Sequence, residues 1–229
     1  MVTATKDDIL GLGIYTPAEA AFYARVHTST LKRWIHGNRS GLPVVDAQLA
    51  GDPERTITFL DFVQALAIRS IRRDMKISLQ KIRDAVELAK DKYQVQYPFA
   101  MKHKTFVFGD EILIEIETHG LVRMSGTLKR QHVMKAIAEP YLQDVSFGAD
   151  MLAQAYKAFE HQDRRIVMDP KKRLGQPVIT GCRYTAGALW HAYRTEGSVT
   201  AAAKAYGVEQ ADVDLAIRYY DYLLGPLAA

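Results

Sequence analysis

Apolar residues in the first ninety positions recur at the three- and four-residue spacing of amphipathic helices. Thr16 followed by Pro17 predicts the start of the first helix. A threonine hydroxyl can cap a free amide, and a proline at the first helical position loses no hydrogen bond. This helix is expected to run to about Ala24, with Val26 filling the turn that follows it.

A second short helix follows the turn, with Leu31, Trp34 and Ile35 spaced to face inward. The hydroxyl-bearing residues at its start can cap it, namely Thr28, Ser29 and Thr30. Its outward positions are Ser29, Lys32, Arg33 and His36. The pattern therefore predicts a helix-turn-helix with a polar, basic outer face.

The next segment alternates short apolar runs with turn residues. Residues 42–45 and 55–58 are expected to form the two strands of a small wing that flanks Asp52 and Pro53. A helix is expected to begin at Asp61, and Ser78 is expected to cap another helix over residues 79–89.

The middle of the chain changes to a β pattern after Pro98. Residues 105–108 and 111–117 predict a hairpin, because they are rich in aromatic and β-branched residues and are separated by a Gly-Asp pair. Residues 128–138 predict a helix, and Val145 to Phe147 predict a returning strand. For residues 152–159 propensity favours a helix, but a third strand is also compatible with the sequence.

The C-terminal part has two short apolar strands separated by a basic turn within residues 166–185, followed by a helix capped by Thr185. A second helix-turn-helix pattern comes next: Ser198 caps residues 199–206, and the last helix covers residues 209–224. The inward positions of that helix are Val213, Ala216, Ile217 and Tyr220.

Composition places the chain among globular proteins, since 48% of its 229 residues are apolar and 24% are charged. No apolar run approaches the roughly 20 residues of a membrane span, and the N-terminus lacks a secretion signal, so no membrane association and a cytoplasmic location are expected. Cys182 is the single cysteine, which excludes an intramolecular disulfide and argues against structural zinc. The net charge of +4 alone does not predict nucleic-acid binding.

Local charge is more informative than net charge. Between Glu19 and Asp46 the chain has four Lys or Arg residues and no acid. A basic face on the second helix suits the major groove, where arginine can form paired hydrogen bonds with guanine. The alternative interpretation is a helical hairpin whose basic face is simply solvated.

Residues 12–90 resemble the winged DNA-binding domain of the MerR type, with a helix-turn-helix, a wing, a helix and the segment from Ile77 to Ile82 in that order. The chain departs from that family at Arg25, which stands where glycine is usual in the turn. Metal-sensing members of the family bind their ion through paired cysteines, which this chain lacks.

Residues 164–224 resemble a family of domains of unknown function that is common in bacterial antitoxins. The shared pattern is Asp169-Pro170, then Gly-x-Pro-x-Ile-x-Gly-x-Arg over 175–183, then Ala203-x-x-Tyr206-Gly-Val and paired tyrosines at 219–220. Cys182 occupies a slot that is often threonine. Together the parts resemble a class of VapB-type antitoxin, which pairs with a PIN-domain ribonuclease toxin, neutralises it and represses the operon that encodes both.

The expected fold is therefore α+β and mainly helical, in three domains. Residues 1–92 are expected to form the MerR-like winged helix-turn-helix, 93–163 a small β-rich middle section, and 164–229 a C-terminal helical domain with a helix-turn-helix-like pattern. The expected partners are double-stranded operator DNA, the toxin and a second copy in a homodimer.

Candidate site residues follow from charge and position. The candidates for DNA contact are Thr28, Ser29, Thr30, Lys32, Arg33, His36, Arg39 and Arg55, with Arg33 as the expected base reader. The last helix is not expected to enter a groove, because it begins with Glu209, Gln210, Asp212 and Asp214.

PIN nucleases hold their metal with acids, so the candidates for toxin contact are Arg164, Arg165, Lys171, Lys172 and Arg173, against the simpler interpretation of an exposed basic turn. The candidates for dimerisation, or for packing on the middle section, are Leu215, Ile217, Tyr219 and Tyr220.

The sequence bears on two other classes of function. A free-standing MerR-like transcription regulator that senses a small molecule through its middle section fits the sequence as the alternative. An enzyme does not fit well, because no nucleophile-base motif, paired acids or glycine-rich phosphate loop is present. No cofactor or metal is expected, since His103, His119 and His132 lack partners at ligand spacing.

Overall fold

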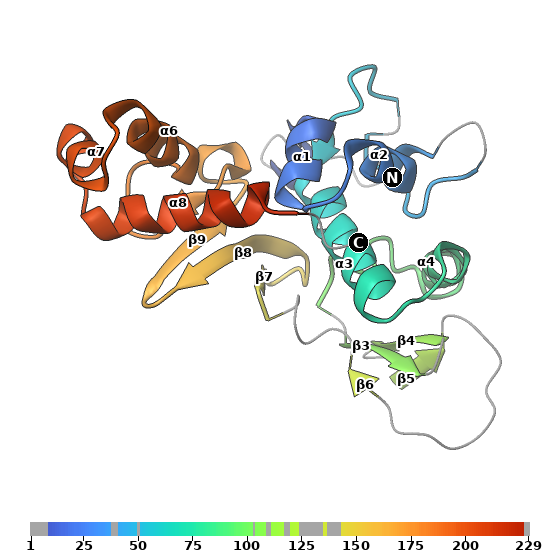
Figure 1. The fold of residues 1–229 in the computed structure, drawn as a ribbon. Coiled ribbons are helices and arrows are strands. Elements are labelled where there is room, and N and C mark those ends of the chain that lie inside the picture. The colour runs from blue at the N-terminus through green and yellow to red at the C-terminus, as the bar shows by residue number, and fades with distance from the viewer. Residues whose placement is uncertain are drawn as a thin grey trace. The chain divides into compact units, whose positions relative to one another are not determined.

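The computed structural model describes residues 9–37, 41–49, 51–102, 104–108, 111–116, 120–123, 135–136 and 143–226. The chain divides into two compact units, one running to residue 154 and the other from residue 155 onward. Figure 1 draws the helices and strands of both units.

The predicted pair of short N-terminal helices is confirmed. Thr16 caps the first helix in a capping box: its hydroxyl accepts from the Glu19 amide, and the Glu19 carboxylate accepts from the Thr16 amide at 2.9 Å. The helices are α1 (Pro17–Tyr23) and α2 (Thr28–His36).

The central helix of the first unit is α3 (Phe59–Asp74), which is buried on nearly all sides along its first ten residues. Thr58 caps it, because its hydroxyl accepts from the Asp61 amide at 3.1 Å. The helix therefore begins two residues before the predicted start at Asp61. Tyr15 packs on Phe62 at 5.3 Å between ring centroids, which joins the N-terminal strand to the core. The fourth helix, α4 (Leu79–Tyr93), is capped by Ser78 as predicted.

The prediction that residues 42–45 and 55–58 form the two strands of a wing is wrong. Residues 42–45 form no strand, because the Val44 and Val45 amides both donate to the Trp34 carbonyl at the end of α2. Arg83 of α4 also donates to the carbonyls of Leu42 and Pro43. The segment after Arg55 contributes β2 (Ile57–Thr58), whose antiparallel partner is β1 (Gly13–Tyr15), preceded by the 3-10 turn η1 (Ile9–Gly11).

A four-stranded antiparallel sheet follows α4, with strand order β5-β4-β3-β6. The predicted hairpin is confirmed, with Phe106 opposite Leu113. Of the helix predicted over residues 128–138, only Lys135 and Ala136 are described, and they form a strand against Phe106 and Val107 of β3 instead. The strands are β3 (Lys104–Phe108), β4 (Glu111–Ile116), β5 (Gly120–Arg123) and β6 (Lys135–Ala136).

A second antiparallel sheet has the order β10-β9-β8-β7. Residues 152–159, for which the sequence was compatible with a helix or a strand, lie almost entirely in strand β8. The register of β8 with β9 shifts between Lys157 and Phe159. The returning strand predicted over Val145 to Phe147 is confirmed. The elements are β7 (Val145–Phe147), β8 (Ala153–His161), β9 (Arg164–Met168) and β10 (Val178–Ile179), with the 3-10 turn η2 (Arg173–Gly175) between the last two.

Three helices complete the second unit, each starting at or next to its predicted cap. They are α6 (Ala186–Glu196) after Thr185, α7 (Val199–Tyr206) after Ser198, and α8 (Gln210–Leu224) after Glu209. Ala192, Ala202, Ala203 and Val213 form a core cluster where the three helices meet. Small residues at these positions let the helix backbones approach closely.

The expectation of a mixed fold with prominent helices and small antiparallel sheets is confirmed. None of the described helices has the length and apolar content needed to cross a bilayer. The division into three domains stays a prediction.

Candidate nucleic-acid interface

The helix α2 is buried on one side and open on the other. Leu31, Trp34 and Ile35 are at most 5% exposed and pack inward, as the spacing predicted. Ser29, Lys32 and Arg33 are exposed on the opposite side, also as predicted. Because the buried side fixes the rotation of the helix, these three side chains form one surface, which we call the α2 outer face.

The start of α2 differs from the prediction in its cap. His27, not Thr28, Ser29 or Thr30, is the N-cap: its Nδ1 accepts from the Ser29 amide at 3.3 Å and lies 2.7 Å from the Ser29 hydroxyl. Thr28 and Thr30 are half-buried. A histidine cap has no strong sequence signal, since hydroxyl and carboxamide side chains lead the cap preferences.

The turn between α1 and α2 keeps a glycine-like backbone without glycine. Arg25 has φ 50°, in the left-handed region that glycine adopts without strain. Arg69 of α3 donates to the Ala24 carbonyl at 2.7 Å and so holds the end of α1. Nothing in the local sequence pattern singled out Arg69, since its partner lies 45 residues away.

The structure brings two further DNA-contact candidates together. The His36 Nε2 lies 3.2 Å from the Arg55 carbonyl oxygen, which places exposed Arg55 at the C-terminal end of α2. Partial burial lowers the pKa of His36, which favours the neutral ring. Arg39, the remaining candidate, lies outside the described residues.

The loop that carries Arg55 is built by an acid. Asp52 accepts from the amides of Glu54 and Thr56 at 3.0 and 2.8 Å and from the Thr56 hydroxyl. These hydrogen bonds, the Thr56 hydroxyl first, lower the pKa of the Asp52 carboxyl. Arg55 has φ 54°, so the loop fixes an uncommon backbone geometry beside α2.

The burial of one acid of the first unit was not predicted. Asp61 is fully buried near the start of α3, and its Oδ2 accepts from the Gln48 amide at 3.2 Å. Burial raises the pKa of the Asp61 carboxyl to about 6. The sequence marked Asp61 as a helix-start residue, which usually implies an exposed side chain.

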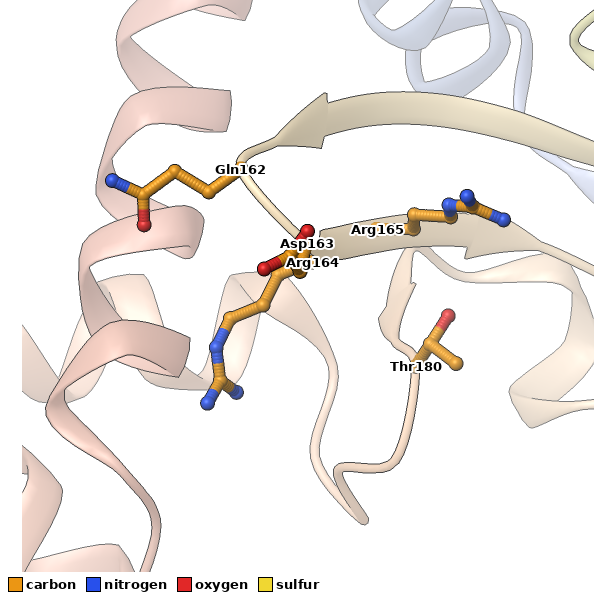
Figure 2. Close-up of a pocket in the computed structure, with 5 residues that line it drawn as sticks. All are labelled: Gln162, Asp163, Arg164, Arg165 and Thr180. Carbon is orange, nitrogen blue, oxygen red and sulfur yellow. The ribbon is translucent and has the colours of Figure 1, made fainter.

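The basic candidates in the second unit have partners within that unit. Arg164 bonds to Asp212 and Glu209 at the start of α8, and Arg165 Nε lies 2.8 Å from the Glu160 carboxylate. Asp212 is therefore buried against β9, and does not lie on the exposed leading side of α8 as expected. Gln162, Asp163, Arg164, Arg165 and Thr180 line an open pocket of about 450 Å³. Figure 2 shows the Arg164 and Arg165 side chains extending away from one another.

The remaining basic candidates occupy the turn between β9 and β10. Lys171, Lys172 and Arg173 are all exposed. Lys172 Nζ is 3.5 Å from the Asp169 carboxylate, and Arg173 donates to the Arg183 carbonyl at 3.0 Å.

The dimerisation candidates divide by exposure. Leu215 and Tyr219 are each 1% exposed, and Tyr219 packs on Phe159 of β8 at 5.8 Å between ring centroids. Ile217 and Tyr220 are half-buried, and Tyr220 stacks on Trp190 at 4.5 Å. Only the second pair retains area that a partner could cover.

Among the described residues, no group of three or more His, Cys, Asp or Glu side chains could hold a metal ion. Cys182 is half-buried with a free thiol.

Comparison with known proteins adds three findings. A family model described as "Protein of unknown function (DUF433)" matches residues 166–220. The chain is 28% identical over 221 residues to a Mycobacterium tuberculosis protein named "Putative antitoxin VapB45", covering 85% of this chain and 88% of that one. The crystal structure of Rv2018 from Mycobacterium tuberculosis matches with a TM-score of 0.60 and 24% identity, over 90% of this chain and 98% of that one, which shows a shared fold. The chain is thus similar over most of its length to a protein named as an antitoxin.

Proposed function

We propose that this chain is the antitoxin of a toxin–antitoxin pair, that it binds a PIN-domain ribonuclease toxin, and that it represses its own operon by binding operator DNA. The similarity to a protein named as an antitoxin supports the toxin–antitoxin role and a regulatory, non-enzymatic activity. The location of operator DNA implies that the chain acts in the cytoplasm.

One observation carries the DNA-binding part of the proposal. The α2 outer face presents Ser29, Lys32 and Arg33 on a short helix whose other side is fully buried. A fixed helix of this kind fits the width of the major groove, and its cations can contact phosphates and a guanine edge. Exposed Arg55 extends this basic surface beyond the end of α2.

The test uses the DNA upstream of the chain's own gene. We expect the double substitution Lys32→Glu with Arg33→Glu to weaken binding by about 1–3 kcal/mol per residue, measured by fluorescence anisotropy. The matched control reverses two exposed helix cations elsewhere, Lys92→Glu with Lys204→Glu, and should bind within about threefold of the wild type. Equal losses of DNA affinity in both double variants would show that only net charge matters. Unchanged binding by Lys32→Glu with Arg33→Glu would show that α2 is not in the interface.

For toxin contact we propose the turn carrying Lys171, Lys172 and Arg173, because its three cations are consecutive and exposed and Lys172 lies 3.5 Å from its partner Asp169, whereas Arg164 and Arg165 form closer ion pairs with acids of their own unit. A basic turn is complementary to the acids that hold the metal in a PIN nuclease. Charge reversal across Lys171 to Arg173 should abolish inhibition of the nuclease. Retained inhibition would refute this assignment.

We also propose a homodimer, since two copies would present two α2 helices to an inverted repeat. Ile217 and Tyr220 are the candidate contacts that keep exposed area. A monomer by light scattering at micromolar concentration would contradict the dimer.

A further inference from the structure

The turn between β9 and β10 has an unusual backbone. Arg173 and Leu174 both have φ 50°, in the left-handed region, and Gly175 follows at φ 73°. Two consecutive non-glycine residues in this region are uncommon, since each brings its Cβ too close to its own carbonyl. Surrounding structure must therefore hold them there.

Hydrogen bonds on both sides of the turn provide that support. The Lys172 amide donates to the Asp169 carbonyl at 2.8 Å, and the amides of Gly175 and Gln176 donate back into the turn, each at 3.1 Å. The Arg173 guanidinium ties the turn to the Arg183 carbonyl at 3.0 Å. The tip is thus fixed before any partner arrives.

This fixed backbone displays an apolar side chain. Leu174 is 63% exposed, whereas the next residue, Gly175, is buried. A single exposed leucine is ordinary on protein surfaces. Of the large apolar side chains exposed in the described part of the chain, however, Leu174 is the one on a left-handed backbone. The turn therefore holds a strained geometry without burying Leu174 within its own unit.

The surroundings of Leu174 are cationic. Lys171, Lys172 and Arg173 precede it directly and are exposed, and the Lys172 side chain is 72% exposed. The nearby acid, Asp169, has a side chain only 17% exposed. The tip therefore combines one apolar contact with a basic rim.

We propose that Leu174 is the anchor with which this turn docks into an apolar recess, rimmed by carboxylates, on a protein partner. The proposal rests on the proposed function, because the acidic partner it names is the toxin. Phosphates would attract the lysines but would gain nothing from a leucine, so the exposed side chain favours a protein over DNA. A tip that is already ordered loses little conformational entropy on binding, which is what an anchor residue requires.

The test compares binding with stability in the full chain. The probe is the purified protein encoded beside the chain's own gene in the same operon, with affinity measured by calorimetry. We expect Leu174→Gly to weaken binding at least about tenfold. The melting temperature of this variant should equal that of the wild type or exceed it by a few degrees, because glycine adopts left-handed φ without strain. Leu174→Asn should behave similarly, since asparagine tolerates this region.

The matched control is Leu42→Asn, which removes another exposed leucine, 78% exposed, from a backbone without positive φ. It should leave affinity within about threefold. If the operon partner binds and Leu174→Gly keeps full affinity, the anchor is refuted and the antitoxin proposal stands. If that partner does not bind the wild type, the toxin pairing fails and the anchor fails with it. If Leu174→Gly binds its partner fully but charge reversal of the lysines weakens DNA binding, the turn is a DNA contact.

Discussion

At the scale of single residues, the two cations of the α2 outer face should have separable roles. Arg33 can form a paired hydrogen bond with one guanine, whereas Lys32 contributes a point charge to phosphates. We expect Arg33→Ala to lose about 1–3 kcal/mol and to relax the preference at one base pair. Lys32→Ala should weaken all sequences alike and lower the salt slope by about one.

A salt titration of each variant on the upstream DNA and on single-base variants of it separates these outcomes. Identical behaviour of the two variants on every sequence would contradict separate roles for Lys32 and Arg33.

Asp61 predicts a pH dependence of stability. Its pKa is about 6 in the folded protein against 3.8 for a free side chain, so the folded state holds this proton more tightly. The resulting stabilisation is fully present below about pH 4 and is lost as pH rises through about 6. Asp61→Asn keeps the shape and cannot ionise, so its stability relative to wild type should rise by up to roughly 3 kcal/mol between pH 4 and 7.

Urea unfolding of both proteins across this range gives the comparison. Parallel pH profiles for Asp61→Asn and the wild type would show that Asp61 titrates at its ordinary pKa in the folded protein.

Residue-level roles were predictable from sequence where spacing alone decides them. Leu31, Trp34 and Ile35 are buried because they share one side of a helix. The His27 cap, the burial of Asp61 and the Arg69 contact to Ala24 were missed, because each depends on a cap of low propensity or on a partner distant in sequence.

At the scale of elements, Arg164 joins the start of α8 to β9. Its guanidinium bonds to Asp212, whose side chain is only 10% exposed, and to Glu209. Arg164→Gln leaves the buried Asp212 carboxylate without its cation, so we expect the second unit to lose about 1–3 kcal/mol of stability.

Arg165 provides the matched control, being adjacent, 60% exposed and paired with Glu160. Arg165→Gln should change stability by about 0.5 kcal/mol or less. Thermal unfolding measures both stabilities. Equal destabilisation by the two substitutions would mean that the ion pair at the start of α8 has no special structural role.

Element starts with a strong cap were well predicted, as Thr16, Ser78, Thr185 and Ser198 show. Strand pairing was less predictable. The wing failed because Trp34 and Arg83 engage the backbone of residues 42–45, and β2 pairs with β1, more than forty residues earlier. The strand at Lys135 and Ala136 similarly depends on the edge of β3, which a local propensity does not include.

For the whole molecule, we propose that the first unit contacts DNA and the second unit contacts the toxin. The α2 outer face lies before residue 154, and the turn with Leu174 lies after it. Substitutions in one should therefore leave the other function intact.

The most direct test is to purify the full chain, tagged at its N-terminus, from its native cell in moderate salt, and to measure the mass of the particle and identify what stays bound. We expect a complex of two copies of this chain with a stoichiometric small ribonuclease. A clean homo-oligomer without a nuclease, still able to bind its own upstream DNA, would contradict the antitoxin assignment and favour a stand-alone regulator.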